Sequence, residues 1–291
     1  MAARAQGLID DADYDLAGVV LESWDAFIGL VDGADLSAST RLKGWDVREI
    51  ALHLGTWDGK SALSQVTDSL RTGDTERALD ADAFNAAVLK AHRAASDDDV
   101  RAALAESRAA VAKLLSSDEA RERKGDPVSS VLGPMPLLTV VHAGCYELAV
   151  HALDIADAID GSCPPELLRH GVAALTDSTG CLAAREGIDA TVGIDADEAP
   201  WSFVTHADGQ WSTQRIEGKA HGPRVSGSAE DLLEASAGRA DPVKLVTLRH
   251  LKIKHLGGLL ALTPIIDQVP GLPGGRGLRV AAKSLGGLFN H

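Results

Sequence analysis

The apolar residues of this chain change their spacing near residue 165, and this change limits the folds that the chain can adopt. Up to that point they recur at intervals of three and four residues, the period of an α-helix with one buried face. Beyond it, a single helix predicted over residues 165–185 is followed by short segments in which apolar and polar side chains alternate. Such alternation is typical of half-buried strands. We therefore predict an α+β protein, with a helical first part and a smaller mixed second part.

The first part is predicted to be an antiparallel four-helix bundle. Its helices are marked by caps or by apolar stripes, and they begin near Leu16, at Asp46, at Ser96 and at Pro136, with a weaker helix over residues 83–92. At the second start, Glu49 follows Asp46 by three residues, as in a capping box. The last helix is expected to continue to Gly161. Short connections between such helices favour antiparallel neighbours.

The second part carries the signals of a small sheet with one helix. Asp208-Gly209 separates two alternating segments, residues 201–206 and 210–216, and this is a strong hairpin signal. Further strands are expected near residues 191–194 and 219–225. Ser228 and Asp231 then form a pattern that caps a helix over residues 232–237, closed by Gly238. Residues 243–262 show no clear period.

Length and charge narrow the class of protein. The 291 residues can bury two cores, and we expect domains over residues 1–163 and 164–270, followed by a Gly-rich extension over 271–291. A net charge of −14 gives no overall attraction to nucleic acid or to an anionic membrane. No apolar run reaches membrane-spanning length, and the first residues lack the apolar core of a signal peptide, so we expect a cytoplasmic protein. The three cysteines, an odd number, suit free thiols in a reducing compartment.

An acid and an imidazole stand four residues apart in the most apolar of the predicted helices. Because four residues make slightly more than one helical turn, Glu147 and His151 point the same way. We predict that they share the buried face of this helix. A buried carboxylate is costly unless it is paired, hydrogen-bonded or bound to a metal. Two interpretations stay open on these residues alone: a Glu–His hydrogen bond in the core, and a metal site with a third ligand elsewhere.

Two segments resemble the paired signatures of the mycothiol-dependent maleylpyruvate isomerase family. They are residues 42–54 (LKGWDVREIALHL) and 147–158 (ELAVHALDIADA). A shorter and weaker likeness, over residues 226–239 (SGSAEDLLEASAGR), is to the C-terminal domain of that family, which is similar to sterol carrier protein 2. The resemblance extends to about residue 260. It implies a DinB-like four-helix bundle followed by a sterol carrier protein 2-like α+β domain.

The same resemblance implies a metal site and a reaction. His53, which alone would be read as a core histidine, becomes with Glu147 and His151 a ligand of a divalent metal, usually zinc. Two imidazoles, one carboxylate and an open position describe a catalytic zinc site better than a structural one. The expected cofactors are this metal and mycothiol or another small thiol, which binds the metal as the thiolate and attacks a small electrophile.

Two further residues are assigned supporting roles. Asp154, one turn after His151, matches the family motif and is expected to orient a ligand imidazole. The resemblance suggests that Arg239 binds substrate carboxylates, a role for which Arg215 and Arg224 compete. The outcome can be cis–trans isomerisation or transfer of the thiol. Two alternatives remain: a metal-containing protein that binds an apolar ligand in its C-terminal domain, and a bundle without metal in which Glu147 and His151 merely pair.

Overall fold

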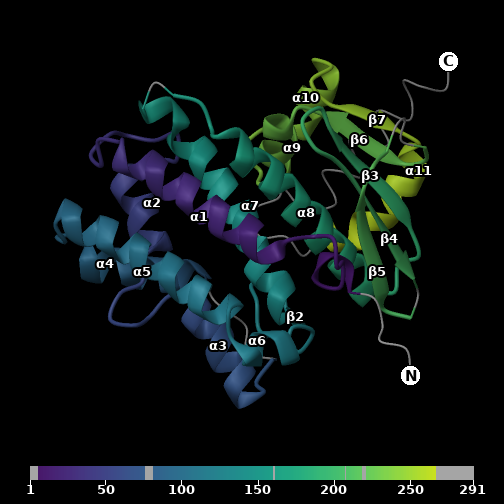
Figure 1. The fold of residues 1–291 in the computed structure, drawn as a ribbon. Coiled ribbons are helices and arrows are strands. Elements are labelled where there is room, and N and C mark those ends of the chain that lie inside the picture. Colours follow the sequence, from purple (N-terminus) through teal and green to yellow (C-terminus); the bar gives the residue numbers. More distant parts are fainter. Residues whose placement is uncertain (1–5, 76–80, 160, 207, 218–220, 267–291) are drawn as a thin grey trace. The chain divides into compact units, whose positions relative to one another are not determined.

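A computed structural model gives the architecture of the chain (Figure 1). The residues that it describes are 6–75, 81–159, 161–206, 208–217 and 221–266. Contacts between Cα atoms divide the chain into two units, Asp15–Gly171 and Met1–Tyr14 with Val172–His291. The first is helical and the second contains a sheet, so the predicted α+β class is confirmed. The extension expected over 271–291 lies outside the described residues.

The helical unit is a bundle built around its longest helices. Its elements are α1 (Leu16–Asp32), α2 (Val47–Leu54), α3 (Ala62–Thr72), α4 (Ala81–His92), α5 (Asp97–Leu115), α6 (Asp118–Glu122), β1 (Pro127–Val128), β2 (Met135–Pro136), α7 (Leu137–Ala156), η2 (Asp157–Ile159) and the first turns of α8 (Pro165–Arg185). Helix α1 packs against both α5 and α7, as Figure 1 shows, while α2 packs on α4 and α5. The predicted helical bundle is confirmed, and α3 is an addition to it.

The helix starts follow the caps that the sequence predicts. The Asp46 carboxylate accepts a hydrogen bond from the Glu49 amide at 2.9 Å, and the Glu49 carboxylate accepts one from the Asp46 amide at 2.8 Å. Ser96 and Asp99 form the same reciprocal pair at the start of α5. Helix α7 begins after Pro136 as expected but ends at Ala156, earlier than predicted. A 3₁₀ turn, η2, replaces its last part, and the Gly161 amide donates to the Ala156 carbonyl.

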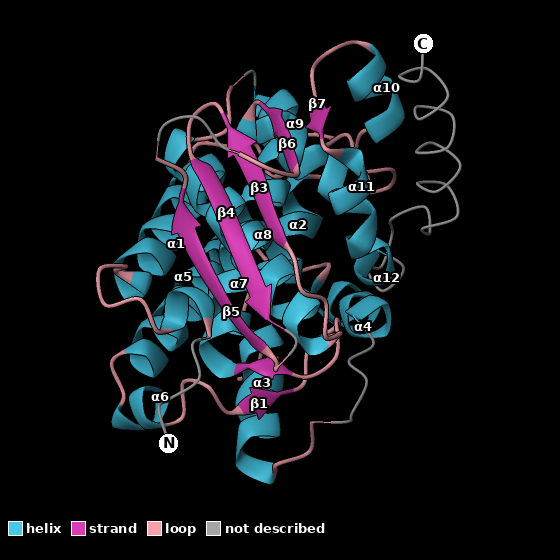
Figure 2. Cartoon of the chain, turned by 90° about the vertical axis from the view of Figure 1, so that its right-hand side faces the viewer, coloured by secondary structure: helices cyan, strands magenta, loops and turns pink. Residues whose placement is uncertain are grey.

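The sheet of the second unit has five strands in the order β5-β4-β3-β6-β7 (Figure 2). They are β3 (Thr191–Ala196), β4 (Pro200–His206), β5 (Gln210–Arg215), β6 (Arg224–Gly227) and β7 (Lys252–Lys254). Strands β3 and β6 are parallel and the other neighbours antiparallel. The β4–β5 hairpin confirms the predicted one, with Trp201 opposite Arg215. The likeness of this unit to sterol carrier protein 2 stays a prediction.

Helices complete the second unit. They are α9 (Ala229–Ser236), α10 (Pro242–Thr247), α11 (Leu256–Leu259), η3 (Leu260–Leu262) and α12 (Thr263–Ile266), together with the later turns of α8. Gly180 of α8 lies so close to Trp211 and Phe203 that a Cβ there would approach them to 2.9 and 3.2 Å. Ser228 caps α9 as predicted, and Leu233 on that helix is fully buried. Among the described helices, none is both long enough and apolar enough to cross a membrane.

A short N-terminal segment belongs to the sheet unit rather than to the bundle. Its 3₁₀ turn η1 (Gly7–Ile9) places the Leu8 amide 3.0 Å from Oδ1 of Asp177, a buried residue of α8. The same oxygen accepts hydrogen bonds from Trp211 Nε1 and Thr213 Oγ1 on β5, at 3.1 and 2.7 Å. The contact division thus groups the first 14 residues with the sheet and falls at Gly171, within α8.

Candidate metal centre

Two helices of the bundle bring the three predicted metal ligands together. His53 lies in the last turn of α2, whose start is fixed by the Asp46 capping box. Glu147 and His151 lie one turn apart on α7. One donor atom from each of the three residues lies within 4.8 Å of the other two. Residues that are far apart in the sequence therefore form one cluster of nitrogen and oxygen donors.

The cluster lies at the edge of the bundle, which corrects one prediction. His151 is buried, with 8% of its side chain exposed, but the Glu147 side chain is 54% exposed. The prediction that Glu147 shares the buried face of its helix is therefore wrong. The core instead takes the run from Leu148 to Ala156, every residue of which is buried. An exposed carboxylate beside two enclosed imidazoles leaves one side of the cluster accessible from solvent.

The distances in the cluster suit a metal better than a direct hydrogen bond. Nε2 of His151 is 3.7 Å from Oε2 of Glu147, which is too long for a hydrogen bond. Ligand atoms around a tetrahedral zinc are separated by about 3.3 Å, since zinc–nitrogen and zinc–oxygen bonds are about 2.1 Å. Small rotations of the side chains would bring the donors to that spacing. Two imidazoles and one carboxylate also form a donor set that zinc accepts.

The ring of His53 is surrounded by aromatic and polar side chains. It meets the rings of Trp45 and His151 edge to face, with centroids 5.9 and 5.2 Å away. Its Nδ1 lies 2.8 Å from Oδ1 of Asn85, on α4. Burial lowers the pKa of His53 to about 4, and the nearby imidazole of His151 adds to this effect while the Glu147 carboxylate opposes it. At neutral pH this histidine is uncharged, as a metal ligand must be.

His151 is held from behind by a buried ion pair. Its Nδ1 lies 3.1 Å from Oδ2 of Asp154, whose side chain is fully buried. The other carboxylate oxygen of Asp154 accepts a hydrogen bond at 3.0 Å from Nε of Arg41, in the loop between α1 and α2. The structure thus places Asp154 directly behind a predicted ligand. Arg41 and Asn85 were not predicted as site residues, because an irregular loop and a weakly patterned helix give no spacing signal.

The predicted arginines all belong to the sheet unit. Arg239 follows α9, is exposed, and its amide donates to the Glu234 carbonyl. Arg215 lies over the Trp201 ring, 5.4 Å from its centroid. Arg224 has its Nε 3.8 Å from Asp195. Their roles toward a substrate stay predictions.

The cysteines are buried free thiols. Burial raises the pKa of Cys145, and likewise that of Cys181, to about 12. Because the thiolate is the reactive form, these side chains are unsuited to act as nucleophiles and serve as packing residues. A thiol for chemistry at this site would have to come from a small molecule.

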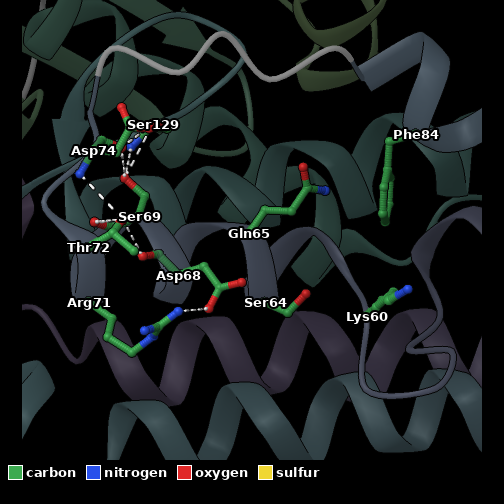
Figure 3. A pocket seen from close by; sticks show the side chains of 10 residues that line it. All are labelled: Lys60, Ser64, Gln65, Asp68, Ser69, Arg71, Thr72, Asp74, Phe84 and Ser129. Atoms are coloured by element: carbon green, nitrogen blue, oxygen red, sulfur yellow. Dashed lines mark hydrogen bonds and ion pairs between the residues drawn. The ribbon is translucent and has the colours of Figure 1, made fainter.

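A separate pocket of the bundle lies along α3 (Figure 3). It has a volume of about 430 Å³, and most of its lining is polar. Figure 3 shows the Asp68–Arg71 pair on one wall and the Ser69 hydroxyl bonded to Ser129 and to the Asp74 carbonyl. None of the three metal-donor residues lines it.

Comparison with known proteins places the bundle in a family. Residues 19–156, a span that contains all three donors, match the family model described as the mycothiol maleylpyruvate isomerase N-terminal domain. No curated protein matches the chain significantly in sequence.

Two crystal structures are similar in fold. One is described as the mycothiol-dependent maleylpyruvate isomerase, with 16% sequence identity, a TM-score of 0.51, and coverage of 92% of this chain and 99% of the other. The second is a mutant of such an isomerase in which a histidine is replaced by alanine, with 15% identity and the same TM-score and coverage. The family resemblance predicted from the sequence is thus confirmed, and residues 19–156 of this chain belong to the mycothiol maleylpyruvate isomerase N-terminal domain family.

Proposed function

We propose that this chain is a metal-dependent isomerase that uses a small thiol, mycothiol or a relative of it, as co-reactant in the cytoplasm. The observation that carries the proposal is the gathering of His53, Glu147 and His151 within 4.8 Å on two helices. The family match and the two isomerase structures support the same class of enzyme. We propose zinc as the metal because this donor set leaves a coordination position open.

The chain's own residues prepare this site in three ways. Asp154 receives the Nδ1 proton of His151, so that the opposite ring nitrogen faces Glu147. Burial keeps His53 uncharged. The exposure of Glu147 leaves the donors open to small molecules. A divalent metal bound here would supply the charge that holds the thiol as its thiolate, the nucleophilic form.

The substrate that we propose is a small anionic enone such as maleylpyruvate. Addition of the thiolate to its conjugated double bond leaves a single bond, about which the carbon chain rotates, and elimination of the thiol then gives the trans isomer. If the thiol stays on the carbon, the same first step becomes an S-transfer. We propose that Arg239 binds the substrate carboxylates, since a guanidinium matches their geometry.

Metal content and thiol-dependent turnover test the proposal together. Protein purified without chelator or added metal is expected to contain close to one zinc by elemental analysis, and to isomerise maleylpyruvate only when mycothiol is added. His53→Ala should lose both properties, whereas His206→Ala, at an exposed strand end, should keep both. Protein that holds no metal, or turnover that does not need a thiol, would overturn the proposal. A stable thiol adduct as product would assign S-transfer instead.

The role of Arg239 is tested separately. Arg239→Ala is expected to keep the metal and to lower turnover by about 10²- to 10³-fold, the effect of removing one preorganised donor to a developing negative charge. Normal turnover in this variant would transfer the role to Arg215 or Arg224.

A further inference from the structure

Each histidine of the candidate metal centre has a hydrogen-bond partner on the side away from the other donors. For His53 the partner of Nδ1 is the amide oxygen of Asn85, at 2.8 Å, and for His151 it is the carboxylate of Asp154, at 3.1 Å. A neutral imidazole has one N–H, and both partner atoms are acceptors, so the proton of each ring lies on Nδ1. The Nε2 lone pairs are then free for a metal.

The two partners differ in charge and in burial. Asn85 is neutral and lies on α4. Asp154 is a carboxylate with none of its side chain exposed, and a charge so placed is costly unless it is compensated. The compensation comes from Arg41, 113 positions earlier in the chain, whose Nε lies 3.0 Å from Oδ1 of Asp154. With one oxygen held by Arg41, the other faces His151.

We propose that Arg41 is a positioning residue of the metal centre: through Asp154 it fixes the tautomer and the ring orientation of His151. This inference rests on the proposed metal site and deepens it. Arg41 touches none of the three donors itself, so its effect on them passes through the carboxylate. The Arg41–Asp154 pair is neutral as a whole, and Glu147 therefore remains the source of negative charge among the ligands.

The test compares metal affinity with stability in three variants. Arg41→Met removes the charge and the donors but keeps an apolar stem, and Arg41→Lys restores the charge and one donor. Arg108→Met is the matched control, because Arg108 also forms a two-bond ion pair, with Asp25, but on a part of the bundle without metal donors. Affinity for Zn²⁺ is measured by competition with a chromogenic chelator at fixed pH. Thermal unfolding of the metal-free proteins is followed in parallel.

The expected result is a selective loss of affinity. Arg41→Met should bind Zn²⁺ about 10- to 100-fold more weakly, the usual effect of losing an outer partner of a ligand histidine. Arg41→Lys should recover most of this loss, and Arg108→Met should bind like the unmodified protein. Equal losses in Arg41→Met and Arg108→Met, or no loss in Arg41→Met, would overturn the proposal while leaving the metal site itself intact. If the unmodified protein binds no Zn²⁺, the proposed function fails as well.

A second measurement needs no variant to fold. Nitrogen-15 NMR of the metal-free, unmodified protein reports which ring nitrogen of His151 carries the proton. A proton on Nδ1 supports the proposal, and a proton on Nε2 overturns it. In Arg41→Met, we expect the His151 signals to shift toward a mixture of the two tautomers.

Discussion

A second histidine of the bundle is enclosed without belonging to the metal centre. His170, in the first turns of α8, has 12% of its side chain exposed. The Ser23 hydroxyl donates to the Val19 carbonyl, so at 2.9 Å it accepts the Nδ1 proton of His170. Burial lowers the pKa of this histidine, and the Glu22 carboxylate, 3.4 Å from Nε2, opposes the shift. The folded protein thus favours the neutral ring.

This preference gives His170 a defined effect on acid stability. Since its pKa is lower in the folded protein, the unfolded chain binds the proton more readily, and stability falls as the pH drops below the ordinary histidine value of about 6.5. His170→Gln, which can keep the bond to Ser23, should therefore lose less stability between pH 7.5 and 5.5 than the unmodified protein. Urea midpoints at the two pH values measure this. An identical pH dependence in the two proteins would contradict it.

At the level of single residues, the sequence predicted the donors of the site better than their surroundings. His53, Glu147 and His151 were chosen from motifs, and the structure brings them together. The exposure of Glu147 was missed, because helical spacing defines a face but does not say which neighbours cover it. Arg41 was missed because its contact with Asp154 joins a loop to a distant helix.

Helix α2 is short for an element that carries a ligand. It has eight residues, and isolated helices of that length are not stable in water. Its stability comes from its buried side chains, among them Val47 and Ile50, and from the capping box at its start. The cap therefore supports the element that presents His53.

Loss of this cap should be measurable. Asp46→Ala is expected to reduce the free energy of unfolding by about 1 kcal/mol, whereas Asp46→Ser, which keeps a cap acceptor, should lose much less. Urea unfolding followed by circular dichroism gives both values. If the two variants are equally destabilised, the capping hydrogen bond is not the source of the effect.

Element predictions succeeded where a cap and an apolar stripe coincide. The start of α5 and the β4–β5 hairpin were predicted in this way. Helix α3 was missed, since its capping box pairs Ser61 with Ser64 in place of the usual Glu or Gln, and its sequence is largely polar. Residues 243–262 could not be assigned, because they form several very short elements whose contacts are with β6 and with one another.

For the molecule as a whole, the N-terminal segment shows that order along the chain and grouping in space differ. Gln6 forms a parallel bridge with Trp211, and Leu8 is buried, with 1% of it exposed. Gly7 between them has φ +63°, a conformation that other residues rarely adopt. The sequence gave no sign of this pairing, since no local pattern connects residues so far apart.

Gly7 provides the test of this grouping. A Cβ at this position would come within 2.1 Å of both Asp177 Oδ1 and Trp211 Nε1. Gly7→Ala should therefore lower the stability of the sheet unit by about 2 to 4 kcal/mol, through backbone strain and overpacking. Gly257→Ala is the control, because a Cβ on this helical glycine of the same unit meets open space. Unfolding midpoints from tryptophan fluorescence compare the two, and a normal midpoint in Gly7→Ala would contradict the grouping.

The pairing of Leu8 with Asp177 also sets an order of events during synthesis. The two residues are 169 positions apart, and at roughly 5 to 20 residues per second a ribosome needs about 10 to 30 s to make the chain between them. Throughout that interval the segment has left the ribosome without its partner strand, while the helices made after it can already form their local contacts. The nascent chain therefore completes its first-made segment among the last, and this delay is the period in which the apolar Leu8 and Ile9 are most exposed to other proteins of the cell.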